Sequence, residues 1–185
     1  FTGQSGYHGR LDPARGPVEA WASPRGPGPY GIAATPGGDV YFASLAGGYL
    51  GLVDRASAQV TVLEPPTANQ GVRRVWSDSR GRLWVSEWKG GRLARYDPAD
   101  GSWQEWPLPG VDPQPYAVWV DDEDFVWVSD FGANAMLRFD PVPETFEAFA
   151  LPSLRGEVRQ IVIGGAGRVG SGSQNRPKLR VALFA

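Results

Sequence analysis

The chain has 185 residues, of which 42% are hydrophobic, no cysteine, and a formal net charge of -2 from 18 basic and 20 acidic residues. Because the charges are interspersed, neither a nucleic-acid surface nor a polybasic membrane-binding segment is expected. No apolar stretch approaches the roughly 20 residues of a membrane helix. The lack of cysteine excludes disulfides and thiolate chemistry, and fits a cytoplasmic or an exported protein.

Turn-forming and aromatic residues are abundant. The 25 Gly and 17 Pro residues suit many turns between short strands, which favours an all-β fold. Eight Trp and eight Phe residues suit packing between sheets. The chain begins at Phe1 and its only methionine is Met136, so we expect a segment that precedes it in the natural protein.

A unit of about 43 residues recurs along the chain. Two series with this spacing mark it, the aromatic residues Tyr41, Trp84 and Trp127 and the turn aspartates Asp54, Asp97 and Asp140. Units of this length with four short strands are typical of β-propeller blades. Helical repeats would need apolar residues at a period of 3.6, which the sequence lacks. The sequence therefore predicts an all-β propeller of about four blades in a single domain, 1–185.

The chain is expected to open inside a blade. Residues 1–24 align with the second half of the later units, because Tyr7 matches Tyr49 and Asp12 matches Asp54. Three complete blades follow, at 27–66, 69–109 and 113–152. The linkers between them are short and rich in proline, which indicates no domain boundary.

Alternating apolar residues predict the strands of these blades. In the first complete blade the expected strands are 30–34, 39–44, 49–53 and 59–63. In the second they are 72–76, 82–87 and 93–96, and the third repeats this order.

After Gly156 the pattern weakens, and 156–185 is expected to be a degenerate blade with strands at 160–163 and 178–184. Gly170 stands where the series predicts an aromatic residue. A degenerate last blade, a truncation and a reading error in the source sequence each explain this. The four blades could close a ring by sharing one blade between the two ends, or form an open arc of a larger propeller. We favour the arc.

One corner of each blade is the expected place for chemistry. The first and second strands are antiparallel, so the start of one lies beside the end of the other, next to the central channel. This rule selects pairs fourteen residues apart: Tyr30 with Ser44, Arg73 with Glu87, Tyr116 with Asp130, and Arg159 with Ser173.

Glu87 and Asp130 are candidate metal ligands or general bases. The alternative for both is solvation, or ion pairing with Arg73, Arg74 or Arg138. Arg73 and Arg159 are candidates for holding an anionic or carbonyl-rich ligand, or else they pack within the channel. Tyr30, Trp88 and Tyr116 either line a pocket or close the packing of the corners.

Three other features are expected to be structural. His8, the only histidine, is level with Leu50 and Met136 in the third strand, which is a packing position. The aspartates that recur in every blade are expected to form turns. The acidic residues 121–124 are expected to be a solvated hairpin on the opposite face.

Three stretches carry a resemblance to a known family: GPYGIAATPGGDVYFAS, GRLWVSEWKGGRLARYDPADG and VWVSDFGANAMLRFDP. Over about residues 1–165 the chain resembles the virginiamycin B lyase (streptogramin lyase) family of bacterial propellers. The resemblance implies a monomeric seven-bladed propeller that uses Mg²⁺. It also implies antibiotic resistance, by elimination across the ester bond of cyclic streptogramin B antibiotics. Four blades would be a little over half of such a ring.

The family's catalytic signature is Glu-x-His at the start of an inner strand, with a second Glu fourteen residues after the His. The His positions correspond to Tyr30, Arg73, Tyr116 and Arg159. The positions of the first Glu correspond to Gly28, Gly71, Gln114 and Glu157, and those of the second to Ser44, Glu87, Asp130 and Ser173. No blade has all three residues, so no catalytic residue is assigned.

Three functions follow from the sequence. The first is a streptogramin-lyase-like enzyme with an incomplete catalytic set in this chain. The second is a non-catalytic ligand-binding or scaffold propeller, and the third is a metal-dependent lactonase-like hydrolase. In each case the expected partner is a small molecule.

Overall fold

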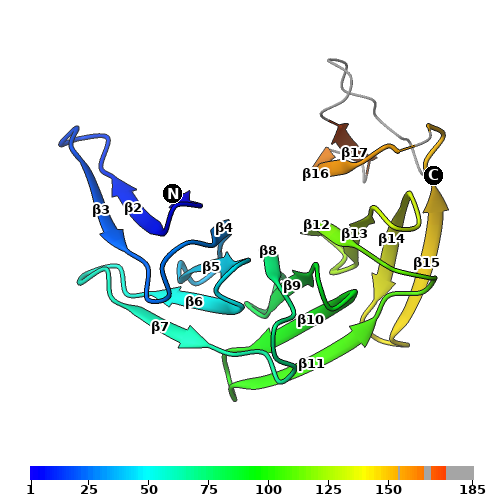
Figure 1. Ribbon diagram of the computed structural model, residues 1–185, viewed down its shortest axis with the longest axis horizontal. Coiled ribbons are helices and arrows are strands. Elements are labelled where there is room, and N and C mark those ends of the chain that lie inside the picture. The colour runs from blue at the N-terminus through cyan, green and yellow to red at the C-terminus, as the bar shows by residue number, and fades with distance from the viewer. Residues whose placement is uncertain (154, 165–167, 174–185) are drawn as a thin grey trace.

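The computed structural model describes residues 1–153, 155–164 and 168–173, and the strand predicted at 178–184 lies outside them. The described residues form β-strands and no helix, arranged as sheets that fan out around an arc (Figure 1). Within this part of the chain no helix is long and apolar enough to cross a membrane. The all-β propeller prediction is confirmed.

Each sheet is an antiparallel meander. The first has three strands: β1 (Thr2–Gly3), β2 (Tyr7–Leu11) and β3 (Val18–Ala22). Three four-stranded sheets follow. The first of them comprises β4 (Pro29–Ala34), β5 (Val40–Ser44), β6 (Tyr49–Val53) and β7 (Val60–Leu63). The next comprises β8 (Val72–Ser77), β9 (Leu83–Glu87), β10 (Arg92–Asp97) and β11 (Ser102–Pro107). The last comprises β12 (Pro115–Val120), β13 (Val126–Asp130), β14 (Ala135–Asp140) and β15 (Thr145–Ala150).

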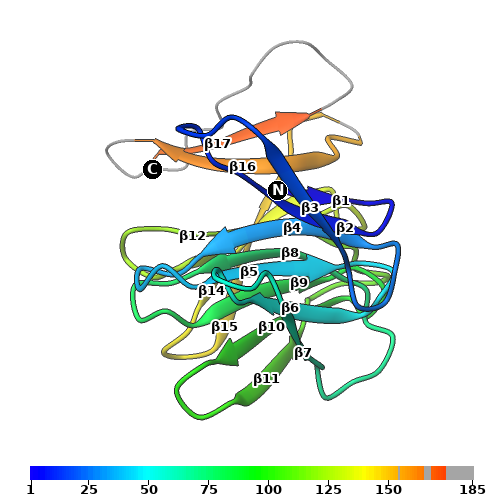
Figure 2. The ribbon, with the colours of Figure 1, turned by 90° about the vertical axis from the view of Figure 1, so that its left-hand side faces the viewer.

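The described residues end in a two-stranded sheet, β16 (Val158–Gly164) and β17 (Arg168–Ser173). The predicted strands agree with the observed ones to within two residues. The inner strands β4, β8, β12 and β16 are neighbours along the arc, and β7 and β11 lie far from them at its outer edge (Figure 2). No hydrogen bonds join the first sheet to the last among the described residues, so the sheets form an open arc.

The core lies between neighbouring sheets. Trp84 of β9 is fully buried against Val118, Val126 and Phe139 of the next blade. Its indole Nε1 donates a hydrogen bond to the Asp78 carboxylate at 3.0 Å. A buried indole needs such an acceptor, because an unpaired polar group in the core is costly.

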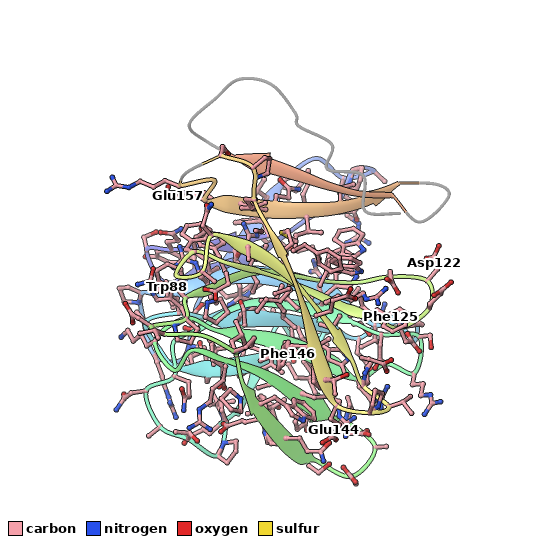
Figure 3. All side chains as sticks on the ribbon, turned by 90° about the vertical axis from the view of Figure 1, so that its right-hand side faces the viewer. Trp88, Asp122, Phe125, Glu144, Phe146 and Glu157 are labelled. Carbon is pink, nitrogen blue, oxygen red and sulfur yellow. The ribbon has the colours of Figure 1, made fainter. Side chains whose placement is uncertain are left out.

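The acidic turn at 121–124 is the equivalent place in the next blade, and the solvated-hairpin prediction is wrong for two of its residues. Asp121 accepts a hydrogen bond of 2.7 Å from the Trp127 indole. Asp124 accepts hydrogen bonds from the backbone N–H and the hydroxyl of Ser79 in the preceding blade, at 2.9 and 2.6 Å. Asp122 is exposed, as predicted. In Figure 3, Asp122 lies on the face opposite Trp88 and Glu157.

The turn aspartates have the predicted structural role. Each accepts a hydrogen bond from the backbone N–H two residues further on, at 2.9 to 3.0 Å; the acceptors are Asp12, Asp54, Asp97 and Asp140. His8 is also structural, because it is 5% exposed and stacked on Phe42, with its Nε2 3.0 Å from the Ala58 carbonyl oxygen.

A β-bulge near the start of each inner strand frees backbone groups that a hydroxyl then bonds. The register shifts after Pro29, Val72, Pro115 and Val158. Ser86 accepts a hydrogen bond from the Arg74 N–H at 3.1 Å and donates one to the Tyr116 carbonyl of the next blade at 2.7 Å. Ser129 repeats this link to Val158, and Thr2 donates to Tyr30. These hydroxyls therefore fix three of the four inner-strand bulges to the preceding blade, whereas Ala43 offers no such link to the bulge at Arg73.

Ser86→Ala is expected to lower the free energy of unfolding by about 1–3 kcal/mol, because it leaves a buried N–H and a buried C=O without a partner. Ala43 occupies the equivalent position one blade earlier, so alanine fits the space. Urea denaturation followed by tryptophan fluorescence measures the change. Exposed Ser5→Ala is the control. Equal midpoints for Ser86→Ala and the wild type would show that this link contributes nothing.

Candidate functional site

The predicted corners lie together at one end of the inner strands. The first residue of each inner strand pairs with the last residue of the second strand: Pro29 with Ser44, Val72 with Glu87, Pro115 with Asp130, and Val158 with Ser173. The sequence rule chose the following residue in each case. The reason for the difference is the bulge, which adds a residue at Tyr30, Arg73, Tyr116 and Arg159. Bulges of this kind re-aim a side chain, and they often occur beside functional sites.

Three of these bulge residues and two aromatic residues that follow the second strands pack together. We call this group the rim cluster, and it consists of Tyr30, Arg73, Trp88, Tyr116 and Phe131. The Arg73 guanidinium carbon lies 3.8 Å from the Tyr116 ring centroid, 4.6 Å from that of Trp88 and 4.8 Å from that of Tyr30. Phe131 stacks on Tyr116 at 4.7 Å. The Tyr30 and Tyr116 hydroxyls are hydrogen-bonded to each other. The cluster thus surrounds the Arg73 cation with aromatic faces, an arrangement that stabilises a partly desolvated charge. The Arg74 guanidinium carbon also lies 4.9 Å from the Tyr30 ring centroid.

The rim cluster perturbs the phenol of Tyr116. Burial of Tyr116 opposes ionisation, but hydrogen bonds with Tyr30 and Arg73 and the charges of Arg73 and Arg159 outweigh it. Together they hold the pKa of Tyr116 below its ordinary value. The Arg159 guanidinium lies 5.6 Å from the Tyr116 ring, so a second blade contributes positive charge at this point.

Glu87 is fully buried, and neither of its carboxylate oxygens has a hydrogen-bond partner. Burial raises the pKa of Glu87 to about 8, nearby Glu105 adds to the rise, and Arg92 opposes it. The carboxyl group is therefore largely protonated at neutral pH. Buried carboxyls with a strongly raised pKa are found more often than others at functional sites.

Asp130 occupies the same corner one blade later but has different partners. Its Oδ1 accepts backbone hydrogen bonds from Gln114 at 2.7 Å and Gly132 at 2.9 Å. Its Oδ2 is buried without a partner. The shorter side chain thus ties together the loops that flank its blade corner.

The expected ion pairs of these two acids do not form with arginine within the described residues. Arg138 pairs with Glu147 at 2.7 Å instead, and Arg73 faces aromatic rings. Glu157 pairs with Arg159 at 3.4 Å, and both are about one third exposed.

A magnesium site needs oxygen ligands that converge on one point. The described part of the chain has no group of three or more His, Cys, Asp and Glu side chains that could hold a metal ion. Glu87 and Asp130 each have free oxygen atoms, but each lies among the residues of its own blade corner.

Two contributors to this face were not predicted from the sequence. Phe131, which completes the rim cluster, lies 43 residues after Trp88, and Ser129 lies 43 residues after Ser86. Extending the repeat to every position near a corner would have found both. The contact between Arg73 and three rings has no comparable signal, because the rings come from three different blades.

The fold and the site define the class of protein: an arc of a β-propeller with a cationic and aromatic cluster at the rim of its channel. The model of the virginiamycin B lyase family matches residues 8–175, and the chain belongs to this family. A sequence search of curated proteins found no match.

Solved structures share this fold at low identity. A catalytically inactive virginiamycin B lyase from Staphylococcus aureus, solved with quinupristin, is 19% identical with a TM-score of 0.85; the match covers 95% of this chain and 59% of that one. Dihydro-heme d1 dehydrogenase is 18% identical with a TM-score of 0.74, over 98% of this chain and 40% of that one. A periplasmic gluconolactonase from Pseudomonas aeruginosa is 16% identical with a TM-score of 0.68, and the match covers 85% of this chain and 50% of that one. The chain thus spans less than two thirds of each of these three structures.

The raised pKa of Glu87 predicts how stability depends on pH. The folded state keeps a proton on Glu87 up to about pH 8, whereas the carboxyl group in the unfolded chain has its ordinary pKa of 4.5. The contribution of Glu87 to the free energy of unfolding is therefore fully present below pH 4.5 and is lost as the pH rises towards 8. Glu87→Gln is expected to be more stable than the wild type at pH 9, on the order of 2 kcal/mol.

Thermal unfolding between pH 5 and pH 9 measures this difference. Exposed Glu123→Gln is the matched control and is expected to follow the wild type. Parallel pH profiles for the wild type and Glu87→Gln would contradict the raised pKa.

Arg73→Met is expected to raise the pKa of Tyr116, because it removes a hydrogen-bond partner and a cation from the phenol. Tyrosinate absorbance during alkaline titration reports it, with Tyr116→Phe to identify the transition of Tyr116. Exposed Arg80→Met controls for the change in net charge. If Arg73→Met titrates like Arg80→Met, the guanidinium does not act on Tyr116.

Proposed function

We propose that the protein is a streptogramin-lyase-like enzyme that opens a cyclic depsipeptide lactone by elimination. The observation that carries this proposal is the rim cluster, because Arg73 and Tyr116 occupy the bulge positions at which the resemblance places the catalytic His. Membership of the virginiamycin B lyase family supports it.

The proposed reaction is balanced without water. A base takes the proton from the carbon next to a carbonyl, and the electron pair of that C–H bond forms a double bond. The bond between the adjacent carbon and the ester oxygen breaks, and its electron pair leaves with the carboxylate. The products are an unsaturated residue and a carboxylate. Negative charge develops on the carbonyl oxygen and on the leaving carboxylate, and preorganised cations stabilise such charge. Arg73 and Arg159 take this role, and the aromatic faces of the cluster hold apolar side chains of the substrate.

Proton abstraction is not assigned to the described corners. The only histidine, His8, is buried in β2 against Phe42, away from the corners. Glu87 is largely protonated at neutral pH, so we do not assign the base to it. The proposal therefore gives these corners substrate binding and charge stabilisation.

A second candidate is a non-catalytic ligand-binding propeller. The close packing of the rim cluster favours it, since Tyr116 is 2% exposed and Arg73 contacts three rings. A third candidate, a metal-dependent lactonase-like hydrolase, shares a fold with the gluconolactonase match and has no assembled metal ligand set among the described residues.

One incubation separates the three candidates. The protein is mixed with a streptogramin B-type cyclic depsipeptide and Mg²⁺, and the products are analysed by liquid chromatography and mass spectrometry. Elimination gives a linear isomer of unchanged mass, hydrolysis adds the mass of one water, and a binding protein leaves the ring intact. We expect the isomer.

Arg73→Met is expected to lower kcat/KM for this reaction at least tenfold, because it removes a charge that stabilises the transition state. Arg80→Met should leave kcat/KM unchanged. An intact ring, or a product heavier by one water, would overturn the lyase proposal.

A further inference from the structure

A hollow lies in the channel wall, along the inner strands and below the rim cluster. It contains about 390 Å³ of atom-free space, partly open to solvent, between β4, β8, β12 and β16. The lining residues that matter here are Ile32, Arg74, Trp76, Ala117, Trp119 and Arg159. Strands rise about 3.3 Å per residue, so Trp76 lies about 10 Å further along the channel than Arg73.

The repeat explains why this wall is hollow. Gly31, Arg74, Ala117 and Gln160 are equivalent positions, each 43 residues from the next. Long side chains thus alternate with small ones around the wall. Ala117, between the long side chains of Arg74 and Gln160, leaves the space. At Gly31 a Cβ would come within 2.8 Å of the Arg74 Cα, so the neighbouring strand packs closely there.

The hollow carries more positive than negative charge. Arg74 makes no ion pair within the described residues, and its buried Nε has no hydrogen-bond partner. The buried Nε of Arg159 also has no partner, although its Nη2 is 3.4 Å from the Glu157 carboxylate. Two guanidinium groups therefore face one acid, and each keeps an unused donor. Planar donors of this kind match a carboxylate.

Two tryptophans supply a flat apolar surface in the same hollow. The Trp76 and Trp119 rings are stacked with their centroids 3.8 Å apart and an angle of 23° between their planes. Both are only partly buried. Partly exposed indoles beside cationic donors favour a planar aromatic ligand with a negative charge.

We propose that this hollow is a second ligand site that binds a small aromatic carboxylate. The ring of the ligand packs against Trp76 and Trp119, and its carboxylate accepts hydrogen bonds from Arg74 and Arg159. This site adjoins the rim cluster, because the guanidinium carbon of Arg74 lies 4.9 Å from the Tyr30 ring centroid and that of Arg159 lies 5.6 Å from the Tyr116 ring centroid. The test of naphthoate binding does not depend on the lyase reaction.

Binding of 2-naphthoate, measured by isothermal titration calorimetry, tests the proposal. Naphthalene-2-carboxamide is the matched neutral probe, because it has the same ring and no charge. We expect the carboxylate to bind at least tenfold more tightly, with an affinity that falls as salt is added. Equal affinities for the two probes, or no heat of binding at millimolar naphthoate, would overturn it.

Variants locate the site. Arg74→Met and Ala117→Leu are each expected to weaken naphthoate binding at least tenfold, the first by removing a donor and the second by filling the hollow. Arg80→Met should bind like the wild type. Circular dichroism confirms that each variant is folded, and Arg74→Met keeps the test valid if Ala117→Leu fails to fold. Naphthoate affinity that is equal in Arg74→Met and Arg80→Met would place binding elsewhere. Ring opening is not measured, so failure here leaves the lyase proposal intact.

Discussion

The bulge at the start of each inner strand is the feature on which the site depends, and a serine or threonine hydroxyl of the preceding blade bonds a carbonyl of three of the four bulges. The bulge at the start of each inner strand interrupts the ladder and leaves a carbonyl and an N–H without a strand partner. Ser86 bonds the N–H of its own blade and the carbonyl of the next one, so neighbouring blades are fixed at the point where the strand bends. Because the bulged side chain is aimed by that bend, the identity of one residue in each blade decides what the channel rim presents.

Asp130 and Glu87 occupy equivalent blade corners but differ in their hydrogen bonds, because their side chains differ in length. Asp130 is short enough for its Oδ1 to reach two backbone N–H groups, which partly compensates its burial. Glu87 is one methylene longer and finds no such donor, so both of its oxygens stay unpaired. An uncompensated buried carboxylate is costly, and the group takes up a proton instead. The same backbone position therefore carries an acid bonded to backbone N–H groups in one blade and an acid with a strongly raised pKa in another.

Much of the fold could be predicted from the sequence, because each blade repeats along the chain at a spacing of 43 residues. That spacing located the strands, the turn aspartates and the packing role of His8. It missed the bulge, since a pattern of alternation cannot show which residue is the extra one, and so each predicted pair was displaced by one residue. It also missed contacts between blades, such as those of Asp124 with Ser79, because neither partner follows from its own blade. The arginines were expected to pair with acids, but aromatic rings from neighbouring blades surround Arg73.

The chemistry of this propeller varies from blade to blade although its backbone does not. The bulge positions hold Tyr30, Arg73, Tyr116 and Arg159. The side chain at one bulge position contacts the side chain at the equivalent position of the next blade. Arg73 packs on Tyr116 of the next blade and Tyr30 of the preceding one, so residues of three blades together determine the surroundings of its charge. A substitution at any of these positions then changes the surroundings of the others while the hydroxyl links keep the strands in place. Family membership therefore fixes where reactive groups can stand in such a fold, whereas the set of residues across adjacent blades decides which reaction or ligand they serve.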